Sequence, residues 1–170
     1  MEEGKMSQTT ERRRFLFLAG MAVAAMPLAR FSEAWAHHGK IKKVEMSEKE
    51  WKDKLAPDQF RVLRGEGTER AFTSPLNKEY RKGTFVCAGC GLELFTSDMK
   101  YDSGTGWPSF FDAIPGHIET KIDYKIGVPR TEYHCARCGG HQGHVFEDGP
   151  QPTGLRYCNN GVALRFKLGE

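Results

Sequence analysis

The chain has 170 residues, of which 39% are hydrophobic and 11% are aromatic. This length is enough for one domain with a hydrophobic core and short for two such domains. The net charge is only +3, and the chain beyond its N-terminal segment has no run of basic residues, so we expect no nucleic-acid partner.

Residues 1–36 have the features of an export signal. A charged cluster precedes a mostly apolar segment, 15–28, which is shorter than the roughly 20 residues of an ordinary membrane-spanning helix. The Arg12-Arg13 pair resembles the twin-arginine signal, and a small-x-small cleavage site ends at Ala36. A buried core helix and an uncleaved N-terminal anchor are the alternatives. We expect an exported, periplasmic protein whose mature domain, residues 37–170, is not stably inserted in a membrane.

Two short helices are predicted at the start of the mature domain. Ser47 and Glu50 have the spacing of a capping box, and Trp51 and Leu55 lie four apart on one face of the helix that follows. A second helix is predicted over residues 57–63, because proline is favoured at the first helical position.

The rest of the chain predicts short strands joined by turns, because glycine and proline recur every several residues. The last strand should place Val162, Leu164 and Phe166 on a buried face, with Arg165 and Lys167 facing water. We therefore expect a mainly β, antiparallel domain with helices at its N-terminal edge. The predicted strands are 84–86, 92–95, 119–124, 130–134, 144–146 and 162–167.

Four of the five cysteines form two Cys-x-x-Cys pairs, Cys87/Cys90 and Cys135/Cys138, each followed by glycine. Two such turns can complete a tetrahedron of thiolates around one zinc ion with no open position, which indicates a structural site. Disulfides, a thioredoxin-like redox pair and haem attachment are alternatives. The redox pair lacks a βαβ context, and haem attachment needs histidine where glycine stands.

The fifth cysteine, Cys158, is a candidate nucleophile. Arg156 lies two residues earlier, so a strand would place both side chains on one face. A neighbouring cation lowers the pKa of a thiol and raises the fraction of reactive thiolate. Asp148 is our candidate for orienting Arg156. The alternative is a buried, unreactive cysteine in the core.

Two further stretches contain residues suited to a site. His141 and His144 lie three apart among glycines and suit proton transfer, a metal pair or ordinary structural hydrogen bonds. Trp107 follows a glycine-flanked turn and precedes proline, which suits an aromatic face fixed beside a small apolar pocket for a methyl or thioether group. Core packing is the alternative for Trp107.

Three motifs closely resemble the signatures of the B-type peptide methionine sulfoxide reductases: Ser103–Phe110, Cys138–Pro150 and Pro152–Asn160. The similarity extends from about Ser47 to Lys167. The resemblance implies a small pair of antiparallel sheets. It also implies that the four paired cysteines bind one structural zinc, as in the zinc-bearing members of the family.

The resemblance further implies a thiol-dependent reduction of methionine-R-sulfoxide, mainly within oxidised proteins or peptides, as expected of an exported repair enzyme. Cys158 would attack the sulfoxide sulfur, release methionine and become a sulfenic acid. His141, His144 and Asn160 would surround the oxygen, and Trp107 would hold the terminal methyl group.

The sequence departs from the family pattern at two positions. Many relatives carry a resolving cysteine in the turn before Trp107, where this chain has Thr105. We therefore expect a thioredoxin-like external dithiol to reduce the sulfenic acid on Cys158, while Arg156 stabilises its thiolate. Gln142 stands between the two histidines, where an apolar residue is common.

Two other functions fit parts of the sequence. One is a zinc-ribbon-like module that binds a protein partner, with Cys158 merely buried. The other is a metallohydrolase that uses His141, His144 and Glu147, although no further ligand has suitable spacing.

Overall fold

The computed structural model describes residues 41–169, so the predicted export segment, residues 1–36, lies outside the described residues. No helix within residues 41–169 combines the length and the apolar character needed to cross a bilayer. The helices are α1 (Glu48–Lys54) and α2 (Pro57–Leu63), and the 3₁₀ turns are Pro75–Lys78, Ser97–Met99 and Gly161–Ala163. The strands are β1 (Gly83–Cys87), β2 (Glu93–Thr96), β3 (Lys100–Tyr101), β4 (Ser109–Phe110), β5 (Ile118–Asp123), β6 (Arg130–Cys135), β7 (His141–Phe146), β8 (Arg156–Asn159) and β9 (Leu164–Leu168).

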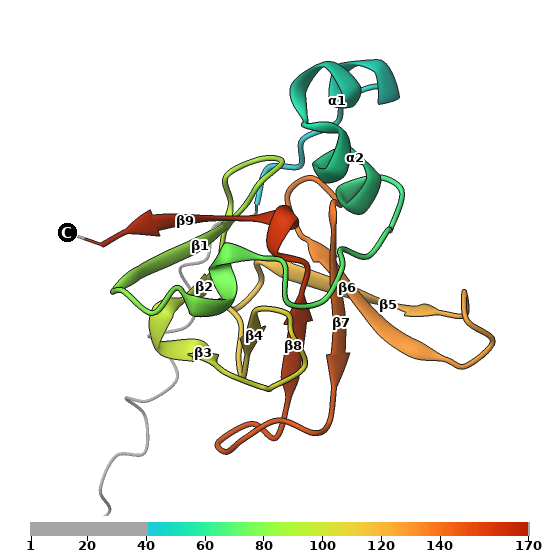
Figure 1. Cartoon of the computed structure of the whole chain (residues 1–170). Helices are drawn as coiled ribbons and strands as arrows, with labels where there is room; N and C mark the ends of the chain where they lie inside the picture. Colours follow the sequence, from blue (N-terminus) through green and yellow to red (C-terminus); the bar gives the residue numbers. More distant parts are fainter. Residues whose placement is uncertain (1–40, 170) are drawn as a thin grey trace, which may run out of the picture. The chain divides into compact units, whose positions relative to one another are not determined.

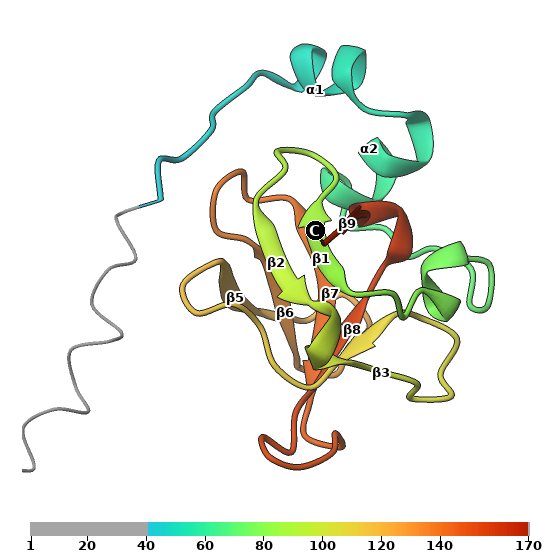
Figure 2. The ribbon, with the colours of Figure 1, turned by 90° about the vertical axis from the view of Figure 1, so that its left-hand side faces the viewer.

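The strands form two antiparallel sheets, which confirms the expected mainly β fold. The smaller sheet has the order β2-β1-β9, and the larger has the order β3-β4-β8-β7-β6-β5. In Figures 1 and 2 both helices lie at one end of the domain and the loop between β7 and β8 lies at the other.

Both helices begin where the sequence predicts, and α2 also ends there, at Leu63. The Ser47 hydroxyl accepts from the Glu50 amide, and the Glu50 carboxylate accepts from the Ser47 amide, so the capping box is present. Trp51 is 2% exposed, and Pro57 opens α2, which buries Val62. Both helices are thus anchored by apolar side chains in the core.

Aromatic rings fill the space between the two sheets. Phe95 of β2 stacks on Phe110 of β4, with ring centroids 4.0 Å apart and an angle of 7° between the planes. Phe95 also meets Tyr133 of β6 at 6.2 Å and Tyr157 of β8 at 6.1 Å. One side chain of the smaller sheet therefore touches three strands of the larger one, including the strand of Cys158.

Six strands were predicted, and three were missed. The missed β3 and β4 have two residues each, too few for a periodic pattern, and β8 lacks alternating aliphatic residues. The last strand was predicted two residues too early, because Val162 belongs to a 3₁₀ turn. Leu164 is buried and Arg165 exposed, as predicted.

Replacing Phe95 by alanine should lower the free energy of unfolding by about 3–5 kcal/mol, because it leaves a cavity between the sheets. Tyr124→Ala is the matched control, since Tyr124 is 68% exposed and should cost under about 0.5 kcal/mol. Urea denaturation measures both. Equal midpoint shifts for the two variants would show that the aromatic contacts do not join the sheets.

Candidate active site

Cys158 lies on β8, near the middle of the larger sheet. Its cross-strand partners are Ser109 on β4 and His144 on β7. Gly143, the neighbour of His144, faces the main chain of β8: a Cβ atom there would come within 1.9 Å of the Cys158 carbonyl oxygen. The close pairing that sets His144 opposite Cys158 therefore requires glycine at position 143.

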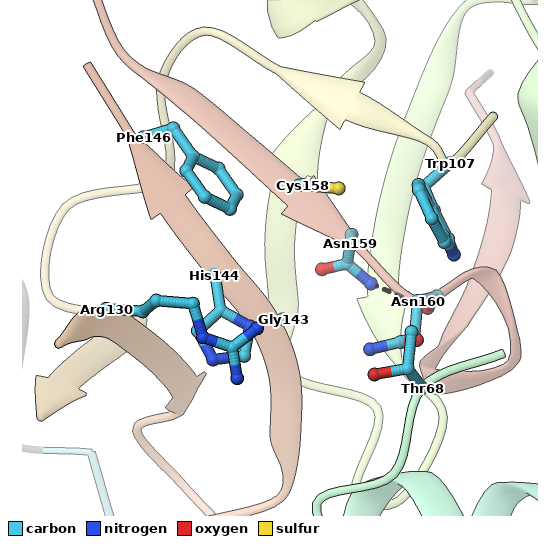
Figure 3. A pocket seen from close by; sticks show the side chains of 9 residues that line it. All are labelled: Thr68, Trp107, Arg130, Gly143, His144, Phe146, Cys158, Asn159 and Asn160. Carbon is cyan, nitrogen blue, oxygen red and sulfur yellow. Dashed lines mark hydrogen bonds between the residues drawn. The ribbon is translucent and has the colours of Figure 1, made fainter. Parts of the chain in front are cut away.

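A pocket of about 130 Å³ opens beside the Cys158 sulfur. In Figure 3 the sulfur points to the side where Trp107 lies, and the Phe146 ring lies on the other side. Two aromatic faces around a sulfur suit a methyl thioether, because such groups pack well against rings. The pocket is lined by Thr68, Trp107, Arg130, Gly143, His144, Phe146, Cys158, Asn159 and Asn160.

The turn before Trp107 is held by hydroxyl groups. Ser103 Oγ lies 2.8 Å from Thr105 Oγ1 and 2.7 Å from Ser109 Oγ. The Trp107 indole nitrogen donates to the Glu69 carbonyl oxygen at 3.2 Å. The turn thus fixes the aromatic face beside the pocket, as the sequence predicted.

Glu69 is a site residue that the sequence analysis missed. Its buried carboxylate accepts from the amides of Gly161 at 2.5 Å and Val162 at 3.1 Å, and its own amide donates to Asn160 Oδ1 at 2.9 Å. Burial raises the pKa of this carboxyl group, and the two amide bonds oppose the rise. Glu69 therefore connects the support of Trp107 to the segment that follows Cys158.

Burial and a nearby cation act in opposite directions on Cys158. Burial raises the pKa of its thiol, whereas the charge of Arg156 and hydrogen bonds from Thr105 and Arg156 lower it. The burial effect is larger, so the pKa lies above the ordinary thiol value. The lowering contribution that the sequence predicts for Arg156 is present, but burial outweighs it, and burial is not visible in a sequence motif.

Asp148 holds Arg156 in the predicted way. Nε and Nη2 of Arg156 donate to Oδ1 and Oδ2 of Asp148 at 2.7 and 2.8 Å, a bidentate pair. The hydrogen bonds from Arg156 lower the pKa of Asp148. The guanidinium carbon also lies 4.3 Å from the centroid of the Phe146 ring, so the cation is fixed on two sides.

The two histidines share a face, although residues three apart on a regular strand do not. Tyr133 pairs with Gly143 while His134 pairs with His141, so β7 carries one extra residue, a β-bulge. The rings of His141 and His144 lie 5.5 Å apart. His144 lines the pocket, whereas His141 is 2% exposed and lies outside the pocket lining.

Each histidine is bonded to a carboxylate that the sequence analysis missed. His141 Nδ1 lies 2.7 Å from Glu132 Oε1, and His144 Nε2 lies 2.7 Å from Asp123 Oδ2, which also accepts from Arg130 at 2.5 Å. The signal for Asp123 was available, since it lies one residue before the end of the predicted strand 119–124 and Arg130 begins the next predicted strand. The two residues pair across the hairpin.

The proton positions follow from these contacts. Burial lowers the pKa of His144 and outweighs the opposing hydrogen bond to Asp123. Hydrogen bonds from the Lys125 amide and from His144 hold the pKa of Asp123 well below its usual range. A neutral imidazole beside a carboxylate carries its proton on the bonded nitrogen, Nε2, which leaves Nδ1 as an acceptor.

Asn160 lines the pocket, but its amide is already engaged. Nδ2 donates to the Gln142 carbonyl oxygen at 2.9 Å, and Oδ1 accepts from the Glu69 amide at 2.9 Å. Its side chain is therefore fixed before any substrate binds. The sequence analysis missed five other pocket residues, which are Thr68, Arg130, Gly143, Phe146 and Asn159.

The four paired cysteines come together where the turn after β1 meets the turn after β6. All four Sγ atoms lie within 4.8 Å of one another, with Cys87 3.7 Å from Cys138 and Cys90 3.5 Å from Cys135. A tetrahedron with metal–sulfur bonds of about 2.3 Å has edges of about 3.8 Å, so the donor set fits one four-coordinate metal ion. All four are free cysteines, not disulfides. We call this group the four-cysteine cluster.

The metal site of the alternative metallohydrolase reading, with His141, His144 and Glu147, is not assembled. Within residues 41–169, the four-cysteine cluster is the group of three or more potential ligands close enough to hold a metal ion. His141 and His144 are instead bonded to Glu132 and Asp123.

Comparison with known proteins agrees with this site. The model of the SelR domain family matches residues 55–168. The peptide methionine sulfoxide reductase MsrB of Leptospira interrogans is 54% identical over 125 residues, which cover 73% of this chain and 95% of that protein. The MsrB of Methanosarcina barkeri is 55% identical over 76% of this chain and 92% of its own, and that of Bradyrhizobium diazoefficiens is 52% identical over 74% and 91%.

A more distant likeness exists to the crystal structure of the Mis18 'Yippee-like' domain, with a TM-score of 0.43 and 18% identity over 53% of this chain and all of that domain. That likeness is too remote to bear on function. The family match over residues 55–168 includes Cys158, the Trp107 turn and the strand of His144, which meet at the pocket. The chain therefore belongs to the SelR-domain family, the B-type methionine sulfoxide reductases.

Proposed function

We propose that this methionine sulfoxide reductase uses Cys158 as its nucleophile and acts on the R epimer, mainly within oxidised proteins. The observation that carries the proposal is the position of the Cys158 sulfur in the pocket, between the rings of Trp107 and Phe146. The other four cysteines are gathered in the four-cysteine cluster. Cys158 is thus the thiol placed to meet a substrate.

In the reductive step the Cys158 thiol supplies both electrons and the hydrogen, so no other reductant is needed. The Cys158 sulfur attacks the sulfoxide sulfur, the S–O bond of the substrate breaks, and an S–O bond forms on Cys158. The methionine sulfur gains two electrons and the cysteine sulfur loses two. The thiol hydrogen ends on the oxygen, so the products are methionine and a sulfenic acid.

His144 is suited to move that proton. Because the pKa of Cys158 is raised and that of His144 is lowered, the resting pair is a thiol beside a neutral imidazole. Nδ1 of His144 accepts the proton as the sulfur attacks and returns it to the oxygen. Arg156 stabilises the transient thiolate, and Trp107 and Phe146 hold the methyl group.

An external dithiol regenerates the enzyme in this proposal. Thr105, which helps to lower the pKa of the Cys158 thiol, occupies the place where many relatives carry a resolving cysteine. A thioredoxin-like partner supplies two thiols, which become a disulfide while the sulfenic acid becomes thiol and water. Export through residues 1–36 would bring the enzyme to oxidised periplasmic proteins.

The metal of the four-cysteine cluster is zinc in this proposal, and its role is structural. Four thiolates saturate a tetrahedral ion, so it joins the turn of one sheet to the turn of the other and offers no open position for a substrate. The residues that hold it are Cys87, Cys90, Cys135 and Cys138.

Cys158→Ser should lower turnover of methionine-R-sulfoxide by more than about 10³-fold, because a hydroxyl is a far weaker nucleophile than a thiol. Wild type should leave the S epimer unreduced. The assay uses separated epimers in an oxidised peptide, with dithiothreitol as reductant and zinc measured in both proteins. Turnover by Cys158→Ser, or equal rates on the two epimers, would contradict the proposal.

Arg156→Met should move the alkylation midpoint of Cys158 to higher pH. The thiolate is the reactive form, and the cation favours it, so removal of the charge leaves burial unopposed and raises the pKa further. Mass spectrometry of the Cys158 peptide after timed iodoacetamide pulses measures the profile. Arg165→Met, at an exposed cation on β9, is the control and should leave the midpoint unchanged. A downward shift in Arg156→Met would overturn the assignment.

Cys87→Ser should reduce bound zinc well below one ion per chain and lower the thermal midpoint by about 10 °C or more, since metal binding contributes directly to folding. Cys158→Ser is the matched control and should keep both its metal and its midpoint. Full zinc content in Cys87→Ser would show that the cluster is not the metal site.

A further inference from the structure

Gln142 is the bulged residue of β7 and is completely buried. Its neighbours along the chain, His141 and Gly143, pair with β6, whereas Gln142 has no cross-strand partner. A buried amide without hydrogen bonds is costly, so its partners inside the protein determine what the residue can do.

The main chain of Gln142 holds the segment that follows Cys158. Its carbonyl oxygen accepts from the Asn160 amide at 2.8 Å and from Asn160 Nδ2 at 2.9 Å. Two hydrogen bonds from one residue fix both the backbone and the side chain of Asn160. The bulge in β7 therefore sets the path of the chain immediately after the nucleophile.

The side chain of Gln142 reaches in two directions. Nε2 donates to the sulfur of Cys87 at 3.5 Å and to the Gly140 carbonyl oxygen at 3.4 Å. Oε1 accepts from Asn159 Nδ2 at 3.4 Å. One amide thus contacts a sulfur of the four-cysteine cluster at one end and the residue next to Cys158 at the other.

Asn159 connects Gln142 to the rest of the core through further hydrogen bonds. Its Nδ2 also donates to the Asn160 carbonyl oxygen, and its Oδ1 accepts from the Tyr133 hydroxyl, both at 2.7 Å. Asn159 is completely buried and lines the pocket. A change in the orientation of the Gln142 amide would therefore alter the hydrogen bonds of Asn159 at the end of β8.

Metal binding would strengthen the hydrogen bond from Gln142 Nε2 to the Cys87 sulfur. A thiolate bound to a metal carries negative charge and accepts an N–H hydrogen bond more strongly than a neutral thiol. Groups that bond to metal ligands also fix the orientation of those ligands and raise affinity for the ion. Because the amide is planar, an Nε2 atom held by Cys87 turns Oε1 toward Asn159.

We propose that Gln142 is a positioning residue that couples the occupied four-cysteine cluster to the Cys158-Asn159-Asn160 segment. The coupling rests on the proposed metal, and its effect on turnover rests on the proposed function. The bound ion orients the Gln142 amide through Cys87, and the amide in turn holds the end of β8 beside the pocket. Loss of the metal therefore changes the position and reactivity of Cys158.

Gln142→Leu tests the coupling, because leucine fills similar space without an amide. Zinc release to excess chelator should become about 10-fold faster, since loss of a bond to a metal ligand typically has effects of this size. The kcat should fall by a larger factor than KM rises, because the displaced segment carries Cys158 while Trp107 and Phe146 stay in place. Gln142→Glu, which turns a carboxylate toward the thiolate, should release zinc faster still. Gln151→Leu, at an exposed glutamine, is the control.

The coupling between the metal and Cys158 is isolated by comparing wild type and Gln142→Leu, each with and without zinc. Alkylation of Cys158, followed by mass spectrometry of its peptide, is measured in wild type and in Gln142→Leu, each with zinc and after stripping. Removal of zinc should change the alkylation rate of Cys158 in wild type and change that rate much less in Gln142→Leu. Equal changes in both proteins, or zinc release from Gln142→Leu at the wild-type rate, would overturn the proposal.

If removal of zinc unfolds the chain, the coupling is tested on the zinc-loaded proteins alone. In that case, hydrogen exchange at the Asn160 amide must speed up in zinc-loaded Gln142→Leu relative to wild type, together with zinc release. Unchanged exchange would overturn the proposal. These measurements need no substrate, so a failure of the proposed reductase chemistry, seen as inactive wild type, remains distinguishable from a failure of the coupling.

Discussion

The close pairing of β7 with β8 is the constraint on which the site depends. At Gly143 the two main chains approach so closely that even a methyl group would collide with the Cys158 carbonyl. That approach places His144 directly across from Cys158 and lets the Gln142 carbonyl hold Asn160. The positions of Cys158, His144 and Asn160 are thus set mainly by the pairing of the two main chains.

The electrostatics of the pocket favour a protonated thiol at rest. Burial raises the pKa of Cys158 more than Arg156 lowers it, and burial also keeps His144 neutral. A thiol held in this state is protected from indiscriminate oxidation, because the thiolate is the reactive form. In the proposed reaction the proton travels with the oxygen, so Cys158 needs to ionise only when a substrate is in place.

The sequence predicted the parts of this structure that depend on local pattern. The capping box of α1, the cysteine pairs, the Trp107 turn and the Arg156–Asp148 contact all follow from residue types at fixed spacings. The burial of Cys158 and the bulge at Gln142 depend on contacts between strands far apart in the chain, which no local pattern contains. Glu69 was missed for the same reason, because its partners at Gly161 and Val162 lie more than ninety residues away. Two-residue strands such as β3 and β4 exist only through their neighbours in the sheet.

The most direct test of the account is a single turnover without reductant. The protein, loaded with zinc, is mixed with one equivalent of methionine-R-sulfoxide peptide, and a probe specific for sulfenic acids is then added. The account predicts one methionine formed per chain and the probe on Cys158 alone, with the four cluster cysteines unmodified. A disulfide that includes Cys158, or probe on a cluster cysteine in place of Cys158, would contradict it.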